Sequence, residues 1–134
     1  MLASAPPSDP RRAPAPVCHR FHYAVELIGR RWTGAILRAL LDGATRFGDV
    51  LAVVPGLSDR LLSERLKELE ATGIVVRTVI PSTPVRVEYR VTEKGRALET
   101  VLASITAWAE VWVPSQEAEV ACATAEAERG LTEA

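Results

Sequence analysis

The sequence predicts an α+β fold that is mainly α-helical, and two observations support this class. Apolar residues recur at the three- and four-residue spacing of amphipathic helices through most of the chain. The spacing changes to the two-residue period of strands over residues 75–91. The length of 134 residues suits one domain, and no apolar run approaches the ~18 residues of a membrane-spanning helix. We therefore expect a soluble, cytoplasmic protein.

Charge is spread unevenly along the chain. A net charge of −1 and a pI near 6.1, taken as single numbers, count against a nucleic-acid partner. Counted by segment, residues 20–96 carry a net charge of +4 and residues 97–134 one of −6. This asymmetry indicates a basic working domain joined to an acidic segment. We expect a disordered Pro-rich arm at 1–16, a folded domain at 17–113, and an acidic Ala- and Glu-rich helix and tail at 114–134.

The folded domain begins with two short amphipathic helices. The first begins near Phe21 and is predicted to close at Gly29. The second runs from Thr33 to the turn at Asp42-Gly43. Their expected inward residues are Phe21, Val25 and Ile28, then Ile36, Leu37, Leu40 and Leu41.

The next two helices carry the most information. A third helix, about Arg46 to Val53, ends at the turn Pro55-Gly56. Ser58 is a good N-cap for a fourth helix, because its hydroxyl can accept from the free backbone N–H groups of the first turn; Gly73 ends that helix. The expected inward residues are Phe47, Val50, Leu51 and Val54, then Leu62, Leu66 and Leu69. Two helices joined by a short turn, the second with a polar outer face, form the helix-turn-helix arrangement.

Two strands follow, at 75–80 and 85–91, and residues 81–84 join them through a tip with two prolines. A hairpin directly after the second helix of such a motif is a wing, so the expected fold is a winged helix-turn-helix with flanking helices. Thr92 can cap a fifth helix, which Pro114 breaks. Its expected inward residues are Leu98, Val101, Leu102, Ile105, Trp108 and Trp112. Ser115 can cap a last helix that ends before Gly130.

Six strings occur in an order that points to a known family. They are LIGRRWT (27–33), LLDG (40–43), RFGDV (46–50), PGLS (55–58), LKELEATG (66–73) and RVEYRVTEKG (86–95). Together they resemble the HxlR family of bacterial winged helix-turn-helix transcription regulators, relatives of the MarR group. The resemblance covers roughly Cys18 to Trp112. It implies a homodimer, held by its first and last helices, that binds a palindromic operator with one recognition helix per half-site.

The recognition helix, about 58–72, would read base edges from its start and outer face. The candidate residues are Ser58, Asp59, Arg60, Ser63, Glu64 and Lys67. Arg60 and Lys67 can donate to guanine or phosphate, whereas the two acids can accept from cytosine or orient a neighbouring Arg. The alternative is a solvated helix face without a ligand. Two acids on this helix repel phosphate, so we expect it to select by sequence more than it adds affinity.

Affinity would then come from cations around that helix. Arg86, placed at the base of the wing (about 80–86), could enter the minor groove or contact phosphate. Arg46 and the pair Arg30-Arg31 could hold the DNA backbone. In the alternative interpretation, Arg86 pairs with Glu88 and the other arginines are ordinary helix-flanking charges.

An aromatic seam would hold the expected dimer. Ile105, Trp108 and Trp112 would meet Phe21, Tyr23 and Leu27 of the first helix in the other subunit. Packing within one subunit is the alternative.

Cys18 is the candidate redox-sensing residue. It precedes His19 and Arg20 at the start of the first helix, where positive charge and free N–H groups favour a thiolate. The resemblance implies a thiol switch for an oxidant or electrophile; the alternative is an inert cysteine. Cys122 could be its partner only across the dimer. No disulfide framework, metal site, cofactor site or catalytic site is expected from the sequence. An effector pocket between the dimer helices is suggested by the MarR relatives, but no ligand is indicated.

The sequence thus predicts a dimeric, sequence-specific regulator that binds double-stranded DNA. A repressor is favoured over an activator, because a small chain acts most easily by occlusion. Two alternatives stay open: a redox- or ligand-responsive sensor whose operator binding is switched, and a winged-helix protein-interaction module without DNA binding. The acidic tail would face away from DNA and limit non-specific binding.

Overall fold

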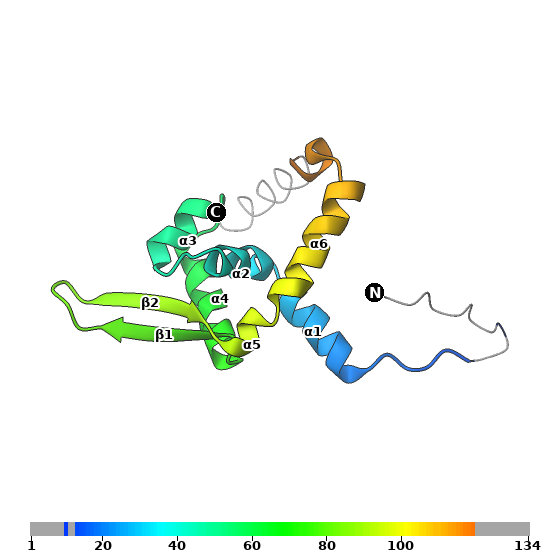
Figure 1. The fold of residues 1–134 in the computed structure, drawn as a ribbon, viewed down its shortest axis with the longest axis horizontal. Coiled ribbons are helices and arrows are strands. Elements are labelled where there is room, and N and C mark those ends of the chain that lie inside the picture. The colour runs from blue at the N-terminus through cyan, green and yellow to red at the C-terminus, as the bar shows by residue number, and fades with distance from the viewer. Residues whose placement is uncertain (1–9, 11–12, 120–134) are drawn as a thin grey trace.

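A computed structural model describes residues 10 and 13–119, and its elements are helices and one hairpin (Figure 1). In chain order they are α1 (His19–Gly29), α2 (Thr33–Leu41), α3 (Phe47–Val53), α4 (Asp59–Ala71), β1 (Val75–Ile80), β2 (Arg86–Val91), α5 (Glu93–Arg96) and α6 (Glu99–Trp112). The hairpin projects from one side of the helices, and α1 and α6 lie on the other side (Figure 1). The predicted mainly helical α+β class is confirmed, with a winged helix-turn-helix at its centre.

The core lies where α2, α3 and α4 meet. Its buried side chains include Ile36, Leu37 and Val50, together with Leu62 and Leu66 from the inward side of α4. Burying one such side chain stabilises the fold by roughly 1.5–3 kcal/mol. These are residues that the helical spacing placed inward, so the sequence locates the core of the helix-turn-helix correctly.

The hairpin is fixed to the helices at one end and free at the other. β1 and β2 are antiparallel, in a register that runs from Val75 opposite Val91 to Ile80 opposite Arg86. At the attached end the Thr92 hydroxyl donates to the Gly73 carbonyl (2.6 Å). The Tyr89 N–H donates to the carbonyl of Thr45, in the loop before α3 (2.7 Å). The hairpin is therefore held in a fixed position beside α4.

The structure confirms one predicted helix end and corrects another. Gly29 is the last residue of α1, as predicted, but the helix does not close through a left-handed turn: Arg30 follows in an extended conformation, and the left-handed residue of this corner is Trp32 (φ 74°). The predicted fifth helix is two helices. The Leu98 N–H bonds to the Gly95 carbonyl three residues back, which interrupts the helical ladder between α5 and α6.

The structure also corrects the predicted inward faces of the outer helices. Leu102 of α6 is buried, but Val101, Ile105, Trp108 and Trp112 are exposed. Phe21 and Val25 are exposed in the same way, and no residue of α1, which is described over its whole length, is buried. The periodicity identified an apolar face correctly, but this face is not covered by the described part of the same chain.

Several predictions fall at the ends of the chain. Most of the Pro-rich arm, Cys122 and the larger part of the acidic tail lie outside the described residues. Residues 115–119 are helical, and the Ala118 N–H donates to the Pro114 carbonyl, so Ser115 lies in the helix and is not its cap. Among the described residues, no helix has the length and apolar character needed to cross a membrane.

Candidate nucleic-acid interface

The start of α4 is built as the sequence predicts. Gly56 has the positive φ (81°) that the turn after α3 requires. Ser58 then caps α4, its hydroxyl oxygen accepting from the Leu61 N–H (3.2 Å). Because Leu62, Leu66 and Leu69 are buried, the opposite side of α4 faces outward.

That outward side carries the predicted reading residues. The side chain of Arg60 is 87% exposed, and its Nε donates to Glu64 Oε1 one turn later (3.3 Å). Asp59 and Lys67 are exposed, and Ser63 is half-buried. Since Nε is engaged by Glu64, the two terminal nitrogens of Arg60 remain available for a ligand. Two acids and two bases leave this face neutral, so non-specific attraction for a polyanion must come from other residues.

An arginine that was not among the predicted site residues lies on the inner side of α4. Arg65 is only 9% exposed. Its Nε donates to the Arg31 carbonyl (2.9 Å), and its Nη1 lies 3.4 Å from Glu68 Oε1. The same Glu68 oxygen is 2.8 Å from Arg30 Nη2. Arg65 stands three residues after Leu62, at an inward position, and this spacing was the available signal.

The cations around α4 differ in their surroundings. Arg86 is exposed and lies opposite Ile80, at the tip end of the hairpin. The predicted position at the base of the wing is therefore wrong. Glu88, the partner in the alternative interpretation, is paired with Arg90 instead (Nη2 to Oε2, 2.8 Å). Within the described chain, Arg86 has no ion pair. The wing therefore presents an unneutralised guanidinium far from the core.

The arginines at the helix corners also differ. Arg46 precedes α3 and is exposed; its backbone N–H donates to the Asp49 carboxylate (3.2 Å). The guanidinium of Arg31 lies 5.8 Å from the centre of the Trp32 ring. Arg30 is held by Glu68. Arg46 and Arg31 stay candidate phosphate contacts.

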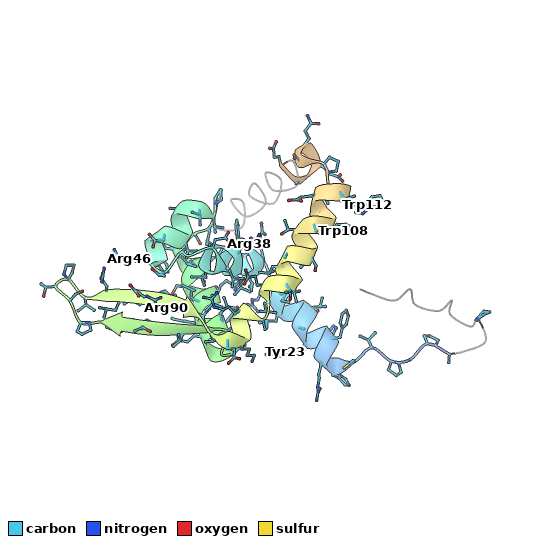
Figure 2. All side chains as sticks on the ribbon, in the orientation of Figure 1. Tyr23, Arg38, Arg46, Arg90, Trp108 and Trp112 are labelled. Carbon is cyan, nitrogen blue, oxygen red and sulfur yellow. The ribbon has the colours of Figure 1, made fainter. Side chains whose placement is uncertain are left out.

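The six residues predicted for the dimer seam lie on α1 and α6. Phe21, Tyr23, Ile105, Trp108 and Trp112 are exposed, and Leu27 is half-buried against the core. Trp108 and Trp112 are 61% and 69% exposed, and Figure 2 shows them on α6, away from the hairpin. An exposed apolar face with two tryptophans is typical of a protein–protein contact.

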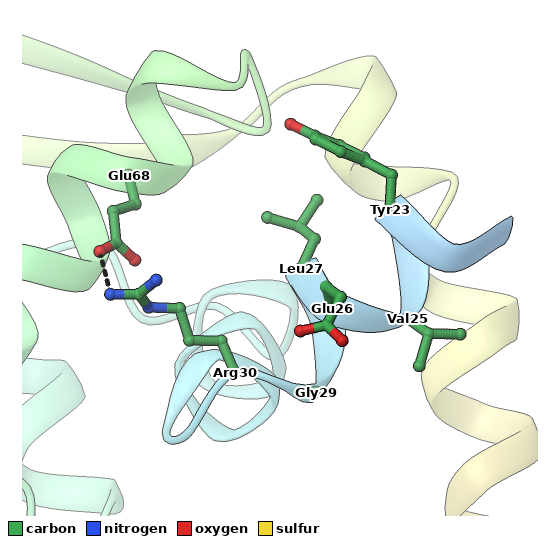
Figure 3. A pocket seen from close by; sticks show the side chains of 7 residues that line it. All are labelled: Tyr23, Val25, Glu26, Leu27, Gly29, Arg30 and Glu68. Carbon is green, nitrogen blue, oxygen red and sulfur yellow. Dashed lines mark ion pairs between the residues drawn. The ribbon is translucent and has the colours of Figure 1, made fainter. Parts of the chain in front are cut away.

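A cavity of about 550 Å³ separates α1 from α4 (Figure 3). Tyr23, Leu27 and Arg30 contribute from α1 and its end, and Glu68 contributes from α4. Figure 3 shows the Arg30–Glu68 ion pair at one side of this space. The two helices are therefore connected across the cavity by charged side chains.

Cys18 lies at the N-cap of α1 and is exposed. Interaction with the backbone N–H groups of Phe21 and then Arg20 lowers the pKa of its thiol. The backbone N–H groups of the helix start thus act on the thiol as predicted, whereas the positive charge of Arg20 is not among the causes of the lowered pKa. The Nε2 atom of His22 lies 3.7 Å from Oε1 of Glu26. The described residues contain no group of three or more His, Cys, Asp or Glu that could hold a metal ion.

The sequence matches a known protein family over most of the described residues. The model of the HxlR-like helix-turn-helix family matches residues 27–117. The chain belongs to the HxlR family. It is 50% identical over 97 residues to the uncharacterized HTH-type transcriptional regulator YvaP of Bacillus subtilis, covering 72% of this chain and 90% of YvaP. It is 46% identical over 94 residues to the HTH-type transcriptional regulator YodB of the same organism, covering 70% and 84%.

Solved structures agree with this assignment. The reduced form of the transcriptional regulator YodB from B. subtilis superposes with a TM-score of 0.66 at 44% identity, covering 72% of this chain and 95% of YodB. The redox regulator HypR in its oxidized form superposes with a TM-score of 0.64 at 36% identity, covering 69% and 95%. YodB has also been solved after diamide treatment and with bound quinone. The relatives are transcriptional regulators, and no enzyme family is indicated.

Proposed function

We propose that this member of the HxlR family binds double-stranded DNA in the cytoplasm as a homodimer and represses transcription from a palindromic operator. Residues 17–113 are the functional unit in this proposal. The observation that carries it is the outward side of α4, which presents Asp59, Arg60, Glu64 and Lys67 behind a capped helix start.

The proposed interface divides its tasks between two elements. α4 enters the major groove, where the terminal nitrogens of Arg60 donate to a guanine edge and Glu64 orients them. The wing follows the adjacent backbone with Arg86, while Arg46 and Arg31 neutralise further phosphates. The exposed face of α1 and α6 holds the second subunit, and two recognition helices then match two half-sites.

A binding-site selection with the full chain tests this function. Arg60→Ala should relax the base preference at one position per half-site and cost roughly 1–3 kcal/mol of discrimination. Arg86→Ala is the matched control, because loss of a phosphate contact weakens binding to all duplexes about equally and lowers the salt dependence. Unchanged base preference in Arg60→Ala would remove the assignment of α4. Absence of any salt-dependent DNA binding would favour a protein-interaction module.

We propose, second, that Cys18 makes operator binding responsive to oxidants or electrophiles. Its exposure, its lowered pKa and the redox forms of YodB and HypR support this role. A quinone is a suitable electrophile: the thiolate sulfur forms a C–S bond as a ring C=C π bond breaks, and the ring, which accepts the electron pair, takes one proton from water and becomes a hydroquinone without a further oxidant. In a disulfide route, diamide takes up two electrons and two protons from two thiols, either Cys18 of the two subunits or Cys18 of one subunit and Cys122 of the other.

The pH dependence of alkylation tests the thiolate. A lowered pKa means that Cys18 should react with iodoacetamide at pH values below the range near 8.5 where an ordinary thiol becomes reactive. Operator affinity before and after quinone treatment then tests the switch, with Cys18→Ser as the control. If the adduct forms on Cys18 and operator affinity stays the same, the switch is wrong.

A further inference from the structure

The buried guanidinium of Arg65 requires an explanation, because a charge at this depth is costly unless it is fully paired. Its neighbours are the Arg31 carbonyl and Glu68, and Glu68 also holds Arg30. Arg30, Arg65 and Glu68 with the Arg31 carbonyl are called the corner clasp below. The clasp places two guanidinium groups around one carboxylate, so Glu68 is the group on which both depend.

The corner that the clasp holds is a strained part of the backbone. Trp32 has a φ of 74°, a conformation that a residue with a large side chain adopts only when its surroundings impose it. The Thr33 N–H closes a turn onto the Arg30 carbonyl (3.1 Å), and Arg65 holds the carbonyl between them. This corner joins α1 to α2, and Arg65 and Glu68 belong to α4. The clasp thus connects three helices at one point.

The connection matters because α1 has few other contacts with the rest of the domain. No residue of α1 is fully buried along its described length, only Leu27 and Ile28 pack half-buried against the core, and the cavity of about 550 Å³ lies between α1 and α4 (Figure 3). Arg30 and Glu68 both line that cavity. A change in the direction of α1 would therefore reach α4 through the clasp.

The geometry points to Glu68 as a positioning residue for DNA recognition: through Arg30 and Arg65 it sets the position of α4 relative to α1. This inference rests on the proposed function of α4. Because α1 also carries Cys18 and part of the proposed dimer face, the clasp sets the recognition helix relative to the second subunit. Two such helices must fit two half-sites at a fixed spacing, so the clasp acts on operator recognition and leaves the reading residues untouched.

The sign of the effect of Glu68→Gln separates positioning from charge. Removing an acid near DNA raises affinity for any duplex if only long-range electrostatics changes. If Glu68 positions α4, the same substitution lowers operator affinity, by about tenfold since both helices of a dimer are affected. Glu68→Asp keeps the charge but is too short to span both arginines, and it should lower operator affinity similarly.

Glu70→Gln is the matched control. Glu70 is exposed two residues further along α4, and its carboxylate has no ion pair in the part of the chain that the structure describes. Its substitution should leave operator affinity unchanged or raise it slightly. Each variant is titrated with the selected operator and with a scrambled duplex at one salt concentration, far below its unfolding temperature, so that the affinity ratio does not report loss of folded protein.

A substitution of the other partner in the Arg30–Glu68 ion pair tests whether the effect of Glu68→Gln comes from loss of this link. Arg30→Met breaks the same link from the α1 side, and the double variant with Glu68→Gln should lose no more operator preference than either single variant. Equal or higher operator preference in Glu68→Gln, as in Glu70→Gln, would overturn the inference while the function of α4 stands. If the unmodified protein itself does not distinguish operator from scrambled duplex, the proposed function fails and the inference with it.

Discussion

The helix-turn-helix and the pair of outer helices α1 and α6 treat the same kind of residue in opposite ways. Leu62 and Leu66 of α4 are completely or almost completely buried, whereas Trp108 and Trp112 of α6 are more than half exposed. The sequence gives both sets the same three- and four-residue spacing. Such spacing therefore identifies a face to be covered, and the cover can come from the same chain or from another one.

The largest expected change in stability comes from a substitution at the junction between the hairpin and α5, which tests how tightly the hairpin is packed against its own chain. In Gly95→Ala, the new Cβ would overlap the backbone carbonyl oxygen of Ile74 and the side chain of Val91. Overpacking against backbone costs ~3 kcal/mol or more, because neither group can move aside cheaply. Urea unfolding of the variant should show this loss. Gly48→Ala is the control; its Cβ meets nothing within 4 Å, and the helix should gain up to ~1 kcal/mol.

A stable Gly95→Ala variant with an unchanged unfolding midpoint would mean that the junction of α5 with the hairpin adapts. The packing beside the helix-turn-helix would then be no more restrictive than the packing of the outer helices.

Residues with local signals could be predicted from the sequence, and residues defined by distant contacts could not. Ser58 as a cap and Gly73 with its positive φ (78°) follow from the chemistry of helix ends. The division of the fifth helix did not follow, because the three-residue bond from the Leu98 N–H to the Gly95 carbonyl leaves no signal in the spacing of the apolar residues. Arg65 was missed because a charged residue is expected outward, and only the Arg31 carbonyl and Glu68 make its burial possible. The outward positions of α4 could be predicted from the spacing of its leucines, but the clasp behind them could not.

The next effect separates the two faces of α6 directly. Leu102→Ala, at a buried position, should lower the free energy of unfolding by ~2–4 kcal/mol. Trp108→Ala, at an exposed position of the same helix, should change the stability of one subunit little but weaken association of two copies by at least ~2 kcal/mol, as at interface hot spots. Sedimentation over a range of concentrations measures the second effect.

The comparison between the faces fails if both variants remain dimers with equal dissociation constants. In that case the exposed tryptophans are not the seam, and another surface holds the second copy.

The smallest expected change in stability comes from a Ser-to-Ala substitution made once at a helix start, in α4, and once within a helix, in α6. Ser58→Ala removes the hydroxyl that accepts from Leu61 N–H at the start of α4, and the helix should lose ~1 kcal/mol. Ser104→Ala removes a hydroxyl that donates to the Thr100 carbonyl within α6 (2.9 Å). That carbonyl already belongs to the helical ladder, so we expect a change within ~0.5 kcal/mol. Both substitutions are best measured in the Trp108→Ala background, where association of two copies contributes least. If the two substitutions lower the free energy of unfolding equally, the hydrogen bond from the Leu61 N–H to Ser58 contributes no more than an ordinary exposed hydroxyl, and the cap has no specific role at the start of α4.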